Sequence, residues 1–231
     1  MLKMGFNEGC TWDGNRGCAD QSLMADLKAC AKYGFKGIDI RFDCLDKYLA
    51  EGGTLEELNA FMKANDIVPL SYNALCFFNM KQTAEEKQAV MDELDDIIKK
   101  CAALDCHMVV VVPSCDLNEK GIEATRQEIR DDAVAVLKEM VKKCEPTGLK
   151  LSLEFCGMSI NTFDDAYEIV KLVDSPLMGV TLDQYHFNGM RSDWSKLEKA
   201  DGDKIFVWHL NDTEDVPAGA GYNTDAKRLW P

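Results

Sequence analysis

Three apolar runs of the chain each end in a side chain that can bind a metal ion. These side chains are Glu154, Asp183 and His209. Two carboxylates and one imidazole suit Mn2+, Mg2+, Co2+ or Zn2+. A carboxylate inside an apolar strand is costly when it lacks a partner, which favours a shared metal over three unrelated polar residues. The sequence therefore predicts a divalent metal site made of Glu154, Asp183 and His209.

Polar residues at other run ends extend this pattern. Two of the chain's three histidines, His186 and His209, lie at or just after such an end. Glu8, Arg41 and Asn73 close three earlier runs. Arg41 and Asn73 are candidates for binding substrate hydroxyl groups, and a salt bridge or a loop cap is an equally good interpretation of both.

The elements that must position these residues are short apolar runs separated by amphipathic stretches. Such runs are typical of parallel strands buried on both faces. The predicted strands are Leu2–Asn7, Gly37–Phe42, Val68–Leu75, Met108–Val112, Leu149–Phe155, Met178–Asp183 and Ile205–Leu210. A period of 3.6 residues predicts helices over 90–104 and 129–144. Strands and helices alternate without a linker, which predicts a single α/β domain over residues 1–231.

Helix boundaries are predicted from capping signals. A hydroxyl residue three positions before an acid can start a helix, because the two side chains satisfy each other's backbone amides. This pattern begins at Thr54, Thr83, Thr162 and Ser195. Glycines that close helices are expected at Gly34, Gly148 and Gly202.

Two parallel architectures compete, an open doubly wound sheet and a closed (β/α)8 barrel. The open sheet usually carries a glycine-rich phosphate turn after its first strand, and neither G-x-G-x-x-G nor G-x-x-x-x-G-K-[ST] occurs here. In a barrel the carboxyl ends of the strands meet at one mouth, where the chemistry takes place. The polar strand ends therefore favour a TIM barrel, although only seven of its eight strands are visible.

Composition excludes several classes of function. The 231 residues contain 26 Lys and Arg against 40 Asp and Glu, so the formal charge is 26 − 40 = −14. This charge opposes binding to nucleic acid and to anionic membranes. The ten cysteines include no C-x-x-C pair, which excludes a zinc ribbon and favours reduced thiols in a cytoplasmic protein.

The sequence resembles the xylose isomerase-like barrels, a group of sugar isomerases and epimerases, and within it the inosose (2-keto-myo-inositol) isomerases of bacterial inositol catabolism. The resemblance covers essentially the whole chain. It is strongest over residues 6–8, 72–79, 161–170, 182–187, 200–209 and 212–215. The metal motif is shared by the whole superfamily, whereas 72–79 and 212–215 are more particular to the inosose branch.

The resemblance implies that Glu154, Asp183 and His209 bind a divalent metal and that His186 contacts the substrate or a second metal. It implies a substrate with a ketone beside a hydroxyl-bearing carbon, isomerised by proton transfer through a metal-stabilised enediolate. Glu154 is then both a ligand and a catalytic base, and His186 a catalytic and substrate-binding residue. The family's fourth ligand is a glutamate on the eighth strand. We expect that strand and the C-terminal helices to be missing from the given chain, which looks truncated after Pro231.

Three alternatives stay open on the sequence alone. A ketose 3-epimerase would use the same metal chemistry on an open-chain sugar. A non-catalytic sugar-binding barrel would explain the absent fourth ligand. An abasic-site endonuclease would need a basic DNA-binding face and more histidines than three, so it is the least favoured. In each of the favoured readings the partner is a small polyol or ketose, with a homo-oligomer possible.

Overall fold

The computed structural model describes residues 4–11, 22–115, 117, 120–156, 159–213 and 228–230. Within them, seven strands form one sheet in chain order, β1 to β7. Their bounds are β1 Phe6–Asn7, β2 Gly37–Arg41, β3 Val68–Cys76, β4 Met108–Val112, β5 Lys150–Glu154, β6 Met178–Asp183 and β7 Ile205–His209. A doubly wound sheet reverses its strand order at a switch point, and a (β/α)8 barrel does not. The observed order is therefore that of a TIM barrel.

Helices and short helical turns connect these strands. Their bounds are η1 Glu8–Thr11, α1 Leu23–Tyr33, α2 Phe42–Ala50, α3 Leu55–Ala64, α4 Ala84–Leu104, α5 Arg126–Cys144, α6 Phe163–Val173, α7 Gln184–Gly189, α8 Trp194–Leu197 and η2 Gly202–Lys204. A separate antiparallel pair joins β8 (Asp212–Thr213) to β9 (Arg228–Trp230). Among the described residues, no helix is long and apolar enough to cross a membrane.

The predicted strands are confirmed with small shifts at their ends. The predicted ends at Phe42, Leu149, Phe155 and Leu210 lie just outside the observed strands, while β3 continues to Cys76. The first predicted strand, Leu2–Asn7, is confirmed only over Phe6–Asn7, because residues 4 and 5 are not in a strand and residues 2 and 3 lie outside the described residues. The two predicted helices are confirmed within α4 and α5, which begin six and three residues earlier than their apolar periodicity.

The chain divides into two compact units. The first unit contains residues 1–74 and 95–109, and the second contains residues 75–94 and 110–231. The helix α4 and the strand β4 each run from one unit into the other. The expectation of a single domain over 1–231 stays a prediction.

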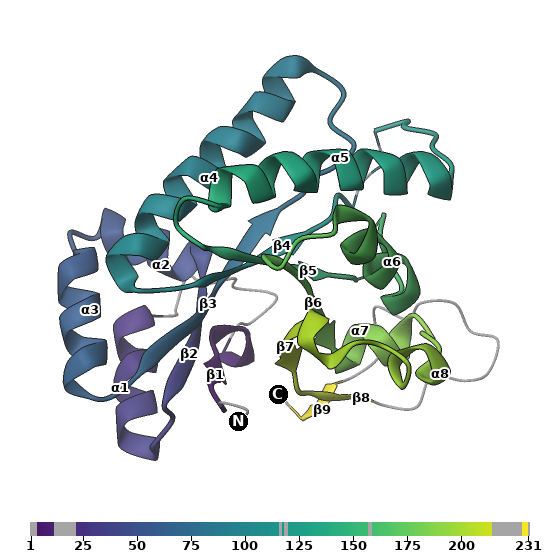
Figure 1. The fold of residues 1–231 in the computed structure, drawn as a ribbon. Helices are drawn as coiled ribbons and strands as arrows, with labels where there is room; N and C mark the ends of the chain where they lie inside the picture. Colours follow the sequence, from purple (N-terminus) through teal and green to yellow (C-terminus); the bar gives the residue numbers. More distant parts are fainter. Residues whose placement is uncertain are drawn as a thin grey trace. The chain divides into compact units, whose positions relative to one another are not determined.

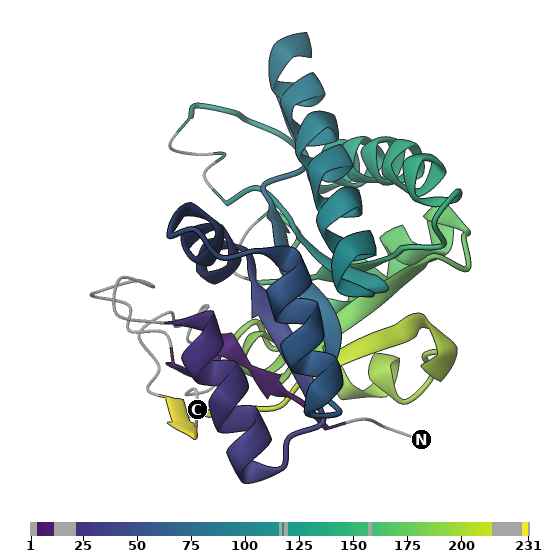
Figure 2. The ribbon, with the colours of Figure 1, turned by 90° about the vertical axis from the view of Figure 1, so that its left-hand side faces the viewer.

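In the first unit, β1, β2 and β3 pair in parallel, with Phe6 beside Ile38 and Arg41 beside Asn73. The helices α1, α2 and α3 of this unit are coloured purple to blue in Figure 2. Thr54 starts α3 with a complete capping box, since its Oγ1 accepts from the N–H of Glu57 while Glu57 Oε2 accepts from the N–H of Thr54. Gly34 ends α1 at φ 80°, a left-handed conformation that favours glycine.

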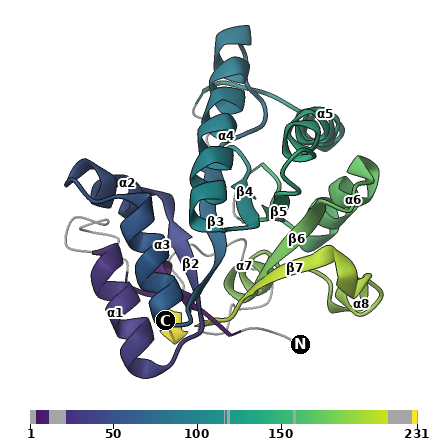
Figure 3. The same cartoon turned by 60° about the vertical axis from the view of Figure 1, so that its left-hand side comes forward.

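In the second unit, β5, β6 and β7 pair in parallel and lie side by side (Figures 1 and 3). All six residues of β6 are buried. The register places Glu154 beside Thr181 and Asp183 beside His209. Because side chains alternate between the two faces of a strand, Glu154 shares its face with Ser152, and Asp183 with Thr181.

The helices α5 and α6 of the second unit bury one apolar stripe each. The buried residues of α5 are Ala133, Leu137, Met140, Val141 and Cys144, and those of α6 are Phe163, Ala166, Ile169, Val170 and Val173. Both sets follow the 3.6-residue period of an amphipathic helix. The N-cap predicted at Thr162 is confirmed, because Thr162 Oγ1 accepts from the N–H of Asp165.

Two predicted helix boundaries are wrong. Ser195 does not start a helix, because Asp193 is the N-cap of α8 and accepts from the N–H of Ser195. Both residues favour N-cap positions, and the acid that comes first in the chain takes it. Gly202 does not close a helix but begins η2, whose N-cap is Asp201. The capping box predicted at Thr83 and the closing glycine predicted at Gly148 are confirmed.

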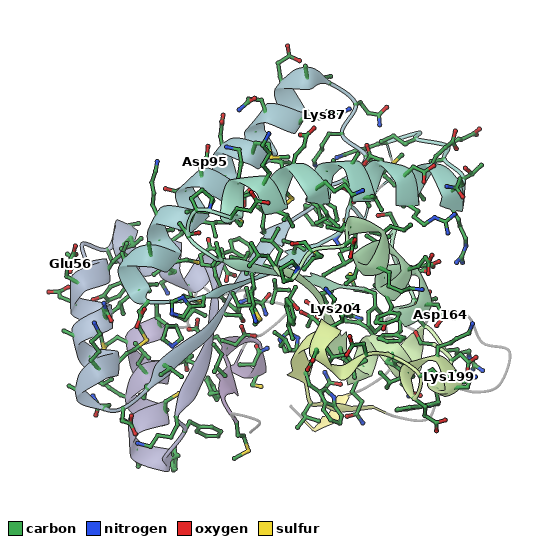
Figure 4. All side chains as sticks on the ribbon, viewed as in Figure 1. Glu56, Lys87, Asp95, Asp164, Lys199 and Lys204 are labelled. Carbon is green, nitrogen blue, oxygen red and sulfur yellow. The ribbon has the colours of Figure 1, made fainter. Side chains whose placement is uncertain are left out.

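Charged side chains lie on the outer surfaces of both units. Glu56 on α3, Lys87 on α4 and Lys199 after α8 are exposed and point away from the ribbon in Figure 4. Among the described residues, the buried acids are the exceptions Glu8, Asp26, Asp39, Glu154 and Asp183.

Candidate metal and substrate site

Glu154, Asp183 and His209 end three neighbouring strands, β5, β6 and β7, and the structure brings them together. His209 Nδ1 lies 3.3 Å from Glu154 Oε1 and 3.7 Å from Asp183 Oδ2. The two acids are 8% and 5% exposed. Parallel strands with this register make the contact unavoidable, because their last side chains leave the sheet at the same edge.

His186 joins the same cluster from the first turn of α7. One ligand atom each from Glu154, Asp183 and His186 lies within 4.8 Å of the others. Two buried carboxylates this close repel each other unless a positive charge compensates them. With two imidazoles beside two carboxylates, the donor set fits a divalent cation such as Zn2+ or Mn2+.

Asp183 is held by several donors. Its Oδ1 accepts from the backbone N–H of His186 at 3.0 Å, so Asp183 is also the N-cap of α7. Asn211 Nδ2 lies 3.2 Å from both carboxylate oxygens. These hydrogen bonds fix the plane of the carboxylate, which orients its free lone pairs.

Two buried hydroxyl groups lie one step inward on the same strands. Ser152 Oγ and Thr181 Oγ1 are 2.6 Å apart, and either can be the donor. Ser152 precedes Glu154 by two residues and Thr181 precedes Asp183 by two, so both hydroxyls face the side of the sheet that carries the acids. The apolar interior of the sheet therefore ends in a polar layer.

Cys156 lies two residues after Glu154 and is 5% exposed. Burial, and then the carboxylates of Glu154 and Asp183, raise the pKa of the Cys156 thiol above its usual range. The raised pKa disfavours the thiolate, which is the nucleophilic form of cysteine.

Arg41 and Asn73, predicted to bind substrate, lie in the first unit, and each has an acidic partner there. The Arg41 guanidinium binds Asp43 through two hydrogen bonds of 2.9 and 2.6 Å. Asn73 Nδ2 donates to Asp39 Oδ2 at 3.1 Å. The salt bridge weighed for Arg41 from sequence is therefore present, and substrate binding by the two residues stays a prediction.

A second group of acids lies in the first unit, directly after β1, on α1 and inside β2. Glu8 is fully buried, and Asp26 and Asp39 are 8% and 5% exposed. Glu8 Oε2 accepts from the N–H of Arg41 at 2.7 Å. Burial raises the pKa of Glu8 to about 8, with the Arg41 N–H opposing and with Asp26 and Asp39 adding to the shift. Glu8 therefore carries its proton at neutral pH.

Sequence reasoning missed Asn211 and Asp39. Asn211 lies between β7 and β8 and reads as an ordinary turn residue, so only its spacing from His209 offered a signal. Asp39 lies inside the predicted strand 37–42, where a single acid among apolar residues was the available clue. Both residues hydrogen-bond to polar side chains that lie far away in the sequence, so neither role is visible from neighbouring residues.

The parallel strand order defines a TIM barrel, and the strand-end cluster of acids and imidazoles has the donor types of a divalent-cation site. The family model described as "Xylose isomerase-like TIM barrel" matches residues 27–229. The chain belongs to this family, and it is an enzyme of the isomerase class.

Relatives over the full chain carry a more specific name. An inosose isomerase of Halalkalibacterium halodurans is 39% identical and one of Bacillus subtilis is 37% identical. All of this chain is aligned in both, with 78% and 79% of those proteins covered. A solved structure described as the IOLI protein with a binding zinc atom is 36% identical, with a TM-score of 0.88 over 100% of this chain and 79% of the other.

A more distant structure shares the fold. D-psicose 3-epimerase, solved in the presence of D-fructose, has a TM-score of 0.71 at 17% identity, with 90% of this chain and 72% of that one covered. At this identity the likeness concerns the TIM barrel alone.

Proposed function

We propose that this protein is a metal-dependent isomerase that interconverts keto-inositols, with 2-keto-myo-inositol as substrate. The observation that carries the proposal is the cluster of Glu154, Asp183 and the two histidines at neighbouring strand ends. Two inosose isomerases aligned with the whole chain, and a bound zinc in a 36% identical structure, support it.

Glu154, Asp183 and His209 are the proposed metal ligands, with His186 able to take part from the other side of the acids. A divalent cation at this position, Mn, Zn, Mg or Co, would supply a positive charge that stabilises negative charge on two adjacent substrate oxygens. The buried position of both acids supports this assignment, because their charges need compensation.

Glu154 is the proposed base. Its carboxylate removes the C–H proton from the carbon that bears the hydroxyl beside the ketone, and in the enediolate the hydroxyl proton passes to the former ketone oxygen. Return of the abstracted proton to the former ketone carbon completes the isomerisation, so that ketone and hydroxyl exchange places. Asp183 is held by three donor contacts and keeps its orientation during the reaction. His186 hydrogen-bonds a substrate oxygen and is the second proposed catalytic residue.

Arg41 and Asn73 are proposed to bind further hydroxyl groups of the substrate. Each is held in place by an acid, Asp43 or Asp39, and both a guanidinium and an amide are groups that hydrogen-bond to hydroxyl oxygens. Their role rests on the resemblance to the inosose branch.

The setting of the proposed enzyme follows from its chemistry. A small polyol is the partner, and a net charge of −14 opposes a role on nucleic acid. We propose a single TIM-barrel domain working in the cytoplasm, with thiols such as those of Cys30 and Cys156 remaining reduced.

The proposal is tested by removing metal from the purified protein with EDTA, adding back Mn2+, Zn2+, Mg2+ or Co2+, and following 2-keto-myo-inositol by NMR in D2O. We expect metal-dependent turnover with deuterium incorporated next to the ketone, because the abstracted proton exchanges with solvent. Fructose is offered in parallel. Turnover of fructose alone would favour a ketose 3-epimerase, and sugar binding without exchange in any metal would favour a non-catalytic barrel.

A further inference from the structure

Asn211 follows β7 directly and is only 6% exposed. Its Nδ2 contacts both oxygens of Asp183, while its Oδ1 is buried and has no hydrogen-bond partner among the described residues. Buried amide oxygens in folded proteins nearly always have a donor. The unsatisfied Oδ1 therefore needs a donor that the described residues do not supply.

The orientation of the Asn211 amide is determined by its neighbour. A reversed amide would place Oδ1 against the Asp183 carboxylate, where two acceptors repel each other. With Nδ2 facing Asp183, Oδ1 of the same amide lies close to this proposed metal ligand, and no described residue donates to it. Leaving such an oxygen empty is costly, and a ligand that supplies a donor recovers that cost.

We propose that Asn211 has two roles, positioning Asp183 through Nδ2 and receiving one hydroxyl group of the polyol substrate at Oδ1. The second role rests on the proposed function. An oxygen that only accepts hydrogen bonds binds a hydroxyl and rejects a ketone, because a ketone has no proton to donate. Asn211 thereby excludes the substrate carbonyl from this position and helps to select one orientation of the keto-inositol ring.

The first role is tested by metal binding without substrate. Zn2+ is titrated into the metal-free protein by calorimetry, and Co2+ is titrated while its visible absorption is recorded. For Asn211→Leu we expect a Zn2+ Kd about 10- to 100-fold higher and an altered Co2+ spectrum, as for other side chains that orient a ligand. An unchanged Kd and spectrum would overturn this role. Asn211→Ser is the second variant in case the leucine disturbs folding.

A matched control comes from the same unit. Asn79 is fully buried, with its amide bonded to Ser114 and Ser159 rather than to the metal cluster. Asn79→Leu also removes a buried amide and is expected to lower Tm while leaving the Zn2+ Kd within about twofold. A loss of Zn2+ affinity in both variants would assign the effect of Asn211 to general destabilisation.

The second role is tested at saturating metal with 2-keto-myo-inositol and its monodeoxy analogues. We expect Asn211→Leu to raise KM about tenfold with little change in kcat, the effect of one lost hydrogen bond. For one analogue, the one that lacks the bound hydroxyl, the KM of wild type and variant should coincide. An equal loss for all analogues would overturn the substrate contact. A Zn2+ Kd raised about 1000-fold or more would instead make Asn211 a metal ligand and overturn the proposal.

Failure of the proposed function gives a different pattern. If no keto-inositol is turned over, the proposed function and the hydroxyl contact are both wrong, whereas the Zn2+ titration of Asn211→Leu still decides whether Asn211 positions Asp183.

Discussion

The two units each contain buried acids, and the groups beside these acids differ. In the first unit Glu8 contacts Asp26 and accepts from the backbone N–H of Arg41, while Asp39 accepts from the amides of Asn7 and Asn73. In the second unit Glu154 and Asp183 contact imidazoles and the Asn211 amide. Buried acids thus lie beside amides in one unit and beside imidazoles in the other, and the second set has the donor types of a cation site.

The difference lies in the donors. Asp39 Oδ2 accepts from Asn7 at 2.8 Å and from Asn73 at 3.1 Å, and Glu8 keeps its own proton. The amide donors and the raised pKa of Glu8 therefore reduce the repulsion between these acids. The histidines of the second unit can be neutral donors of lone pairs, and a metal binds such nitrogens together with carboxylates. Buried acids alone do not define a metal site, because the side chains beside them determine whether a cation can bind.

The largest expected effect is at Glu154. Glu154→Gln keeps the size of the side chain and removes the base, so kcat/KM for 2-keto-myo-inositol should fall about 10²- to 10⁴-fold. The matched control is Glu168→Gln on α6, an exposed residue paired with Lys171. Steady-state kinetics at saturating metal would measure both. Full activity of Glu154→Gln would contradict the proposed role of Glu154 as the base. The functional difference between the two groups of buried acids would then have no support from Glu154.

Next in size is the pH dependence of stability that Glu8 creates. The pKa of Glu8 is about 8 in the folded state and near 4.5 in the unfolded state. Between pH 4.5 and pH 8 the folded state therefore holds a proton that the unfolded state has released. The free energy of unfolding therefore falls as pH rises from about 4.5 to 8, by an amount on the order of 3 kcal/mol. Urea titrations over this range should show a flatter profile for Glu8→Gln.

The groups facing Glu8 that enter this profile are Asp26 and Cys30 of α1 and Asp39 and Arg41 of β2. Glu56→Gln on the exposed face of α3 should keep the wild-type slope. If the free energy of unfolding of Glu8→Gln has the same pH slope as that of the wild type, Glu8 is already ionised in the folded state, as a solvent-exposed acid would be.

A smaller loss is expected at Asp39. Asp39→Leu leaves the amides of Asn7 and Asn73 without their shared acceptor, which should lower the free energy of unfolding by about 2 kcal/mol. Asp39→Asn keeps an acceptor oxygen and should lose less. The Zn2+ Kd should stay unchanged in both, and a weaker Kd would show that the two groups of acids are coupled.

The smallest expected change in stability is at Arg41. The pair with Asp43 is about a quarter exposed, so Arg41→Lys should cost below about 1 kcal/mol in urea titrations. The KM for 2-keto-myo-inositol should rise about three- to tenfold, because lysine lacks the planar fork of the guanidinium. An unchanged KM would limit Arg41 to holding Asp43.

The strands were predictable because buried parallel strands are continuous apolar runs, as in Met178–Asp183, where every residue is buried. The acids and histidine that end them were predictable for the same reason, since a charged residue stands out against such a run. The start of α8 was not, because Asp193 and Ser195 compete as caps and only the local backbone selects one. The role of Asn211 was not predictable either, because it depends on a contact with Asp183, which is 28 residues away.

The hydroxyl pair beneath the acids has a consequence for how the site responds to charge. Ser152 Oγ and Thr181 Oγ1 share one hydrogen bond that can point in either direction. Rotating two protons reverses the local dipole without moving a heavy atom. The rigid sheet therefore holds, one step below the acids, a hydrogen bond whose polarity can reverse while the strands stay in place.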